Sequence, residues 1–238
     1  MIPNTLLEVV TPASSQSLIE LDTLKGDLGI VDGASDARLE RIVASVSWRI
    51  AGYVGRPLIE QEYRETWRLP ANGLDAWSAT LARDRIETLR LSRVPVTSIL
   101  DVVEAGTTLA SDLYVWMDTV GLARLDASGA LSAWASGIVQ VRYRAGWVPP
   151  GTTPSGTQQA LPPDLAEAAL EAARADWFAK GRDPGVVVRS EDVPDVYSVT
   201  YDTRTAAAGE ANGGPGTYGL PATVRGVLDA HQRTSFAF

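Results

Sequence analysis

Residues 36–69, DARLERIVASVSWRIAGYVGRPLIEQEYRETWRL, change from the spacing of apolar residues typical of a helix to the alternation typical of a strand. Apolar residues first recur at steps of three and four, which predicts an amphipathic helix that begins at Asp36, with Ser35 as its N-cap. Gly55 and Pro57 are residues that end helices. Four of the odd positions that follow are apolar and predict a half-buried strand within 58–69: Ile59, Tyr63, Trp67 and Leu69. Helix therefore gives way to sheet near residue 58.

More short strands are expected along the middle of the chain. The apolar runs that indicate them are Ile86 to Leu91, Ser98 to Glu104, Leu113 to Met117, Gly121 to Leu125 and Gly137 to Trp147. Ala105-Gly106 and Ser128-Gly129 are candidate turns. Such a series of short strands predicts an antiparallel β-sheet or a small barrel, inserted between helices.

Helices are expected on both sides of the β region. Leucines at three- and four-residue steps predict one over Leu18 to Leu28, ending near Gly29. Another is expected after a proline-rich connection, with Asp164 as N-cap and closure at Gly181. Its expected apolar stripe is Ala166, Leu170, Ala173 and Trp177. A last short helix has Pro221 near its first position.

These patterns predict an α+β fold in which the N-terminal helices and the C-terminal helical region pack together around an inserted β part. The expected domains are an N-terminal helical part at 1–57 and an antiparallel β domain at 58–148. A proline-rich connection follows at 149–181, with a helix that packs on the N-terminal helices. Residues 182–238 make up an extended C-terminal arm that ends in the last helix. Thr203 to Gly219, with five glycines, is expected to be flexible.

Composition narrows the classes of function. The 238 residues include no cysteine, which excludes disulfides and thiolate metal sites. A net charge of -8 argues against a general nucleic-acid binder, because such binding depends on cations that neutralise phosphates. The N-terminus lacks the pattern of a secretory signal, and no stretch approaches the ~20 apolar residues of a membrane span. We therefore expect a protein without a membrane partner.

No catalytic or metal-binding constellation emerges from the sequence. His231, the single histidine, is flanked by Gln232 and Arg233, so we interpret it as a solvated residue. Asp32 and Asp36 lack the other ligands of a calcium loop and fit a helix-entry turn instead. Phosphate-loop and nucleophile-elbow motifs are absent. We predict no enzyme activity, no catalytic residue, no cofactor and no metal.

Acidic and aromatic residues of the β region leave one alternative open. Carboxylates near tryptophans, namely Glu62, Glu65, Asp84 and Glu87, would suit a glycoside-acting or carbohydrate-binding module. We favour exposed strand and loop positions for these acids, because carboxylates mostly stay in water. The seven tryptophans are expected in the β core and in subunit contacts rather than at a sugar site.

Four arginines share the polar faces of their strands: Arg64, Arg68, Arg142 and Arg144. A solvated sheet face is the simpler interpretation. If the strands are neighbours, these arginines form a basic patch that can meet an acidic surface of another subunit.

Several segments, taken in order, resemble the head-tail connector (adaptor, head completion) proteins of tailed bacteriophages. They are the helical opening Leu18 to Leu28, then Tyr53-Val54-Gly55-Arg56-Pro57-Leu58, then Val141-Arg142-Tyr143-Arg144-Ala145-Gly146-Trp147. Leu161-Pro162-Pro163-Asp164-Leu165, Arg189-Ser190-Glu191 and Leu220-Pro221 follow them. Leu69 to Ala82 and the long Pro149 to Leu161 connection depart from the family pattern.

The resemblance implies a structural virion subunit without catalysis. Its expected assembly is a dodecameric ring in the virion neck, between the portal protein of the capsid and a tail or stopper (head-completion) protein. DNA would pass through the lumen without specific binding, and assembly would take place in the cytoplasm of the bacterial host. The C-terminal region is expected to reach the portal, through Leu220, Val224, Val227, Leu228, Phe236 and Phe238.

Overall fold

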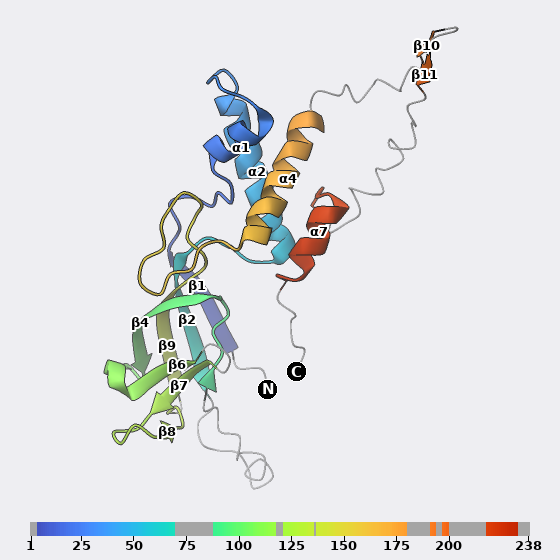
Figure 1. Ribbon diagram of the computed structural model, residues 1–238. Coiled ribbons are helices and arrows are strands. Elements are labelled where there is room, and N and C mark those ends of the chain that lie inside the picture. Colours follow the sequence, from blue (N-terminus) through green and yellow to red (C-terminus); the bar gives the residue numbers. More distant parts are fainter. Residues whose placement is uncertain are drawn as a thin grey trace, which may run out of the picture. The chain divides into compact units, whose positions relative to one another are not determined.

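A computed structural model describes residues 4–69, 88–117, 121–135, 137–179, 191–193, 197–199 and 218–232 (Figure 1). The chain forms two compact units. The β unit comprises Met1–Ser14, Ile59–Val148 and Thr153–Ala160, and the helical unit comprises Ser15–Leu58, Pro149–Thr152 and Leu161–Phe238. Helices and antiparallel sheets are both present, so the predicted α+β class is confirmed.

The described strands of the β unit form two open antiparallel sheets. The larger has the strand order β1-β2-β9-β4-β5, with β1 Asn4–Thr11, β2 Gln61–Leu69, β9 Gly137–Ala145, β4 Val96–Glu104 and β5 Thr107–Thr108. The smaller has the order β3-β7-β6, with β3 Thr88–Leu89, β7 Gly121–Leu125 and β6 Tyr114–Met117. β8 (Leu131–Ser132) pairs with β7, and a short 3-10 helix, Ser111–Leu113, precedes β6. The described strands do not close into the small barrel that was the other expectation.

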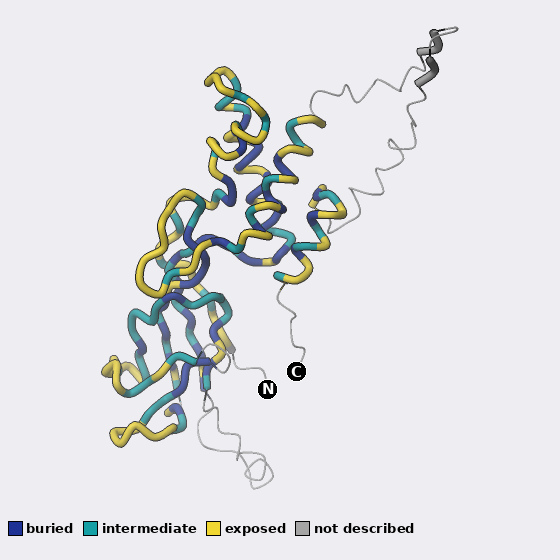
Figure 2. The backbone as a smooth tube through the Cα atoms, viewed as in Figure 1, coloured by how far each residue is buried: buried dark blue, intermediate teal, exposed yellow. Residues whose placement is uncertain are grey.

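One hydrophobic core joins the two sheets. Every second residue of β2 is buried, and Tyr63 lies opposite Tyr143 of β9 in the register. Leu89 and Leu122 of the smaller sheet pack into the same cluster as these tyrosines. The alternation seen in the sequence therefore does mark the inward face (Figure 2).

Strand β1 was not expected from the sequence. It pairs antiparallel with β2 from Asn4 opposite Arg68 to Thr11 opposite Glu62, with a register irregularity after Val9. As the terminal strand of the sheet it is little covered, and Leu6 is 67% exposed. Its partner strand β2 lies more than fifty residues further along the chain. The strand forms through this long-range pairing, which no local sequence pattern indicates.

Among its described residues, the helical unit has four helices: α1 Leu21–Leu28, α2 Asp36–Val54, α4 Pro163–Ala179 and α7 Ala222–Asp229. Helix α2 begins and ends as predicted, and Gly55 takes the left-handed conformation at its C-cap, with φ 78°. Ser35 is the N-cap residue, but its side chain makes no capping hydrogen bond. Helix α1 starts three residues later than expected, while Leu18 before it is buried. None of the helices in the described ranges is long and apolar enough to cross a bilayer.

Helix α4 corrects two expectations. It begins at Pro163, one residue before Asp164, which lies in the first turn instead of at the N-cap. The fixed φ of proline suits the first helical position, where its missing N–H costs nothing. Its buried residues are Leu165, Ala168, Ala169, Ala172 and Ala173, whereas Ala166, Leu170 and Trp177 are half-buried. The predicted stripe was thus rotated around the helix, because alanines on several sides gave no sharp hydrophobic contrast. The expected closure at Gly181 lies outside the described residues.

The segment after α4 contains a two-stranded antiparallel sheet, β10 (Glu191–Val193) with β11 (Tyr197–Val199). No strand was predicted there. Residues 203–217 of the expected flexible arm lie outside the described residues.

Candidate interaction surfaces

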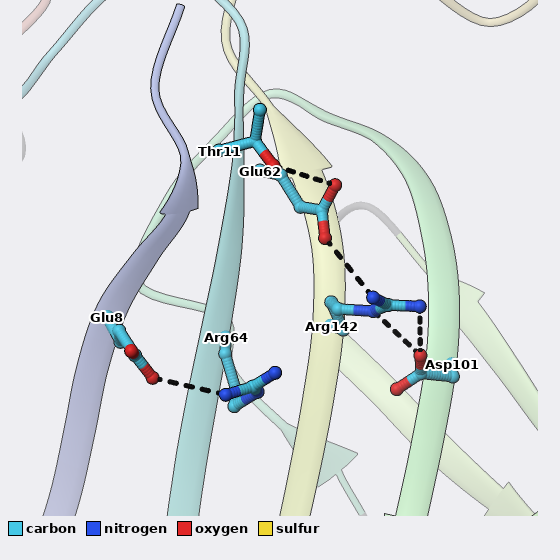
Figure 3. Close-up of polar contacts among 6 residues, drawn as sticks. All are labelled: Glu8, Thr11, Glu62, Arg64, Asp101 and Arg142. Atoms are coloured by element: carbon cyan, nitrogen blue, oxygen red, sulfur yellow. Dashed lines mark hydrogen bonds and ion pairs between the residues drawn. The ribbon is translucent and has the colours of Figure 1, made fainter.

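The outer face of the larger sheet carries ion pairs across neighbouring strands (Figure 3). Arg142 of β9 lies between two carboxylates, with Nη2 2.7 Å from Asp101 Oδ2 of β4 and Nη1 3.6 Å from Glu62 Oε1 of β2. On the other side of β2, Arg64 Nη1 lies 3.4 Å from Glu8 Oε2 of β1. Thr11 donates a hydrogen bond to Glu62. Four strands thus share a surface of alternating charge.

These pairs decide between the two interpretations of the arginines. The strands are neighbours, and Arg64 lies directly opposite Arg142 in the register. Their charges are nevertheless compensated within the sheet by Glu8, Asp101 and Glu62. Arg68 and Arg144 are exposed on their strands. The face is therefore a mixed-charge surface with two exposed arginines, and such surface pairs contribute about 0–1 kcal/mol each.

Glu65 corrects the expectation of exposed carboxylates. Its side chain is fully buried in the β unit. Oε2 accepts hydrogen bonds from the Tyr143 hydroxyl and the Ser92 backbone N–H, both at 2.8 Å, and Oε1 accepts one from the Ser92 hydroxyl. Burial, reinforced by the Glu65 charge, raises the pKa of Tyr143 well above its ordinary value, so its hydroxyl remains a donor. The carboxylate therefore joins β2 and β9 to the segment after β3.

The features that favoured a carbohydrate site have structural roles where they are described. Glu62 belongs to the ion pairs and Glu65 to the buried network, while Asp84 and Glu87 lie outside the described residues. Three tryptophans of the β unit are buried: Trp67, Trp134 and Trp147. They fill the core, as was favoured, and do not form an exposed aromatic platform.

His231 is not the solvated residue that was expected. Its Nε2 lies 2.7 Å from Asp164 Oδ2, and the hydrogen bond from His231 lowers the pKa of that carboxyl. Near the start of α2, Asp32 Oδ1 accepts a hydrogen bond from the Ala34 N–H, which fits the expected helix-entry turn. The described residues contain no cluster of His, Asp and Glu that would hold a metal.

The helical unit has an apolar groove of about 780 Å³ along α2. The segment before α1 forms one wall, and Gly52, Gly55 and Pro57 line its far end. Trp48 lines the groove and is 71% exposed, an unusual position for the largest apolar side chain. The sequence alone missed this residue, because a tryptophan at a helical spacing suggests core.

Three of the six residues expected to meet a portal are buried within the helical unit. Leu220, Val224 and Leu228 are fully buried, and Val227 is half-buried. Helix α7 packs on α4 and α2 and is held by polar contacts at its end. Tyr53 donates to Asp229 at 2.6 Å, and Gln232 donates to the Tyr53 carbonyl at 3.1 Å. Phe236 and Phe238 lie outside the described residues. The face of α7 that was assigned to a partner is therefore occupied inside the helical unit.

This packing makes a measurable prediction. Leu228→Ala should lower the free energy of unfolding by about 2.5 kcal/mol, because it removes buried methyl groups and leaves a cavity. Urea unfolding followed by circular dichroism would measure the loss. Val227→Ala is the matched control and should cost less than about 1 kcal/mol, since that side chain is only half-buried. Equal, small losses in both variants would mean that α7 is not packed as described.

Comparisons with known proteins find similarity in solved structures alone. No protein-family model matches the sequence, and no curated protein matches it either. One similar chain belongs to the neck of an empty gene transfer agent (GTA) particle computed with C6 symmetry, with 19% identity, a TM-score of 0.45, and coverage of 77% of this chain and 89% of that chain.

Two further similar chains come from native GTA particles. The one from the virion is 24% identical, with a TM-score of 0.44 and coverage of 77% of this chain and 89% of that chain. The one from the neck computed with C12 symmetry is 20% identical, with a TM-score of 0.41 and coverage of 77% and 88%.

Proposed function

We propose that this protein is a non-enzymatic structural subunit of the neck of a phage-like particle, a connector between head and tail. The observation that carries the proposal is where the connector-like segments lie in the fold. Four of them fall at junctions between elements: the end of α2, the end of β9, the start of α4 and the start of α7. The proposal gives this chain the same location in a particle as the neck chains to which it is similar.

Each junction depends on a residue type that few others replace. Gly55 ends α2 in the left-handed conformation, and Gly146 follows β9 with φ 124° against the backbone of Glu60. Pro163 is the first residue of α4, and Pro221 is the N-cap of α7. The segments that resemble connectors therefore contain the glycines and prolines that set where helices and strands begin and end. This supports a fold shared with the connector proteins.

At a finer level we propose a ring of identical subunits, twelve by the connector pattern, between a portal and a tail or stopper protein. DNA passes through its lumen without specific binding. The net charge of -8 supports this, since a surface of the same sign as the phosphates does not hold DNA. The carbohydrate-binding alternative loses support because Trp67, Trp134 and Trp147 are buried within the β unit.

We propose that the portal contact belongs to the end of the chain, beyond the packed face of α7. Leu220, Val224 and Leu228 are already buried in the helical unit, so we propose Phe236 and Phe238 for the portal contact. Repetition of one weak contact around a ring gives firm attachment.

The test combines the full-length chain with the portal of the same particle. Native mass measurement and negative-stain microscopy should reveal a ring of identical subunits bound to the portal. Truncation after Gln232 should leave stability unchanged but remove portal binding, whereas Leu228→Ala should weaken the fold first. A chain that neither forms a ring nor binds the portal, or that turns over a glycan, would contradict the proposed function. Normal docking of the truncated chain would remove only the role of the terminal residues.

A further inference from the structure

The larger sheet of the β unit ends at β1, which pairs only with β2 among the described strands. It is eight residues long and contains neither lysine nor proline, the residues that usually protect a sheet edge. Leu6 is 67% exposed and Val9 46% exposed. A long terminal strand with exposed apolar residues is a surface suited to accept another strand.

The second incomplete element is the β10–β11 hairpin. It consists of three residues on each side, Glu191 opposite Val199 through Val193 opposite Tyr197, and the described chain gives it no third strand. A two-stranded sheet of this size is marginally stable alone in water, and gains stability from a further strand or a packing surface. Among the described strands, the hairpin therefore lacks a further partner strand, and β1 has an edge that could supply one.

Two long connections, at 180–190 and 200–217, flank the hairpin in the sequence. Residues 180–190 join it to α4, and residues 200–217 join it to the end of the chain. Eleven residues span at most roughly 36 Å when extended, which exceeds the diameter of a small domain. We therefore consider the hairpin as a donor to another copy.

Charge also favours this match. The sequence from Glu191 to Val199 has three acidic residues and no basic one. On the outer face beside β1 lies the exposed Arg68 of β2, whereas Arg64 is paired with Glu8 of β1. A strand added to β1 would lie about 5 Å from it and two strands from Arg68, within reach of that long side chain.

We propose that the β10–β11 hairpin of one copy adds to the β1 edge of a neighbouring copy and extends its sheet. The contact is head-to-tail, because the donor and acceptor surfaces differ. Contacts of this kind generate closed rings when the rotation between subunits closes. The inference rests on the proposed function, for which it supplies the contact that joins one subunit to the next.

Cysteine cross-linking tests the contact, because the chain has no cysteine of its own. One preparation carries Leu6→Cys or Glu8→Cys in β1, and the other carries Asp192→Cys or Ser198→Cys in the hairpin. A size tag on one preparation identifies the mixed product. After co-assembly with the portal and mild oxidation, at least one pairing should give a mixed disulfide between copies on a non-reducing gel. Mass measurement of the same sample reports whether the ring has formed.

Val31→Cys is the matched control, since Val31 is 99% exposed and lies outside β1. The yield of the mixed disulfide between Val31→Cys and a hairpin cysteine should be at least tenfold lower than that of the β1 pairing. Equal yields would mean random collision and would overturn the inference, as would disulfides between two β1 cysteines alone. A ring that forms without the mixed disulfide would overturn the inference and leave the proposed function standing. Failure of both the ring and the disulfide would overturn both.

Discussion

Gly146→Ala should destabilise the β unit by about 4 kcal/mol, although it adds a single methyl group. A Cβ built at this position would lie 2.6 Å from Glu60 N, 2.7 Å from Glu60 Cα and 2.7 Å from Ile59 C. These are backbone atoms at the entry to β2, so no side-chain rotation relieves the overlap. The φ of 124° adds strain for any residue with a side chain. Urea unfolding followed by tryptophan fluorescence would measure the loss, because Trp67, Trp134 and Trp147 are buried in this unit.

Gly106→Ala is the matched control for this variant. Gly106 also has a positive φ, 84°, but a Cβ there would meet nothing within 4 Å. The alanine should therefore cost about 1 kcal/mol, which is the conformational strain alone. Similar losses in both variants would show that the backbone of Ile59 and Glu60 does not approach Gly146 as closely as described.

The close approach at Gly146 illustrates what a sequence can and cannot predict. The strand that precedes it was predicted from its alternation, and α2 was predicted to the residue because leucines, isoleucines and valines stand against charged residues. The contact of Gly146 with Glu60 depends on two strands more than eighty residues apart, so no local pattern reports it. Strand β1 was missed for the same reason.

For the candidate sites too, local patterns were visible in the sequence and long-range contacts were not. The sequence placed Arg64 and Arg142 on the polar faces of their strands. It did not show the carboxylates that compensate their charges, because these come from β1, β4 and β2 together. The apolar pattern of α7 was also visible in the sequence. An amphipathic helix has the same sequence pattern, however, whether α4 or another protein covers its apolar face. Burial by the chain itself is a long-range property, and only the fold assigned Leu220, Val224 and Leu228 to the helical unit.

Glu65→Ala should cause the largest loss of stability, about 5 kcal/mol, because it removes a buried hydrogen-bond acceptor. The carboxylate accepts from the Tyr143 hydroxyl and from both the N–H and hydroxyl of Ser92. Tyr143 is buried and Ser92 half-buried, and each of these three hydrogen bonds to the Glu65 carboxylate would be lost, at about 1–3 kcal/mol apiece. A loss of this size approaches the whole stability of a typical small domain. Urea unfolding followed by tryptophan fluorescence should therefore find the β unit largely unfolded at low denaturant.

Two variants separate this network from a general effect of removing a glutamate. Glu65→Gln preserves the shape but turns one acceptor atom into a donor, so it should lose about 3 kcal/mol, between wild type and alanine. Glu8→Ala removes a carboxylate from the neighbouring strand whose side chain is 57% exposed, and should change stability by less than about 1 kcal/mol. If Glu65→Ala were as mild as Glu8→Ala, Ser92 and Tyr143 would have other acceptors or water. The inward-facing carboxylate would then be incidental to how β2, β9 and the segment after β3 are held together.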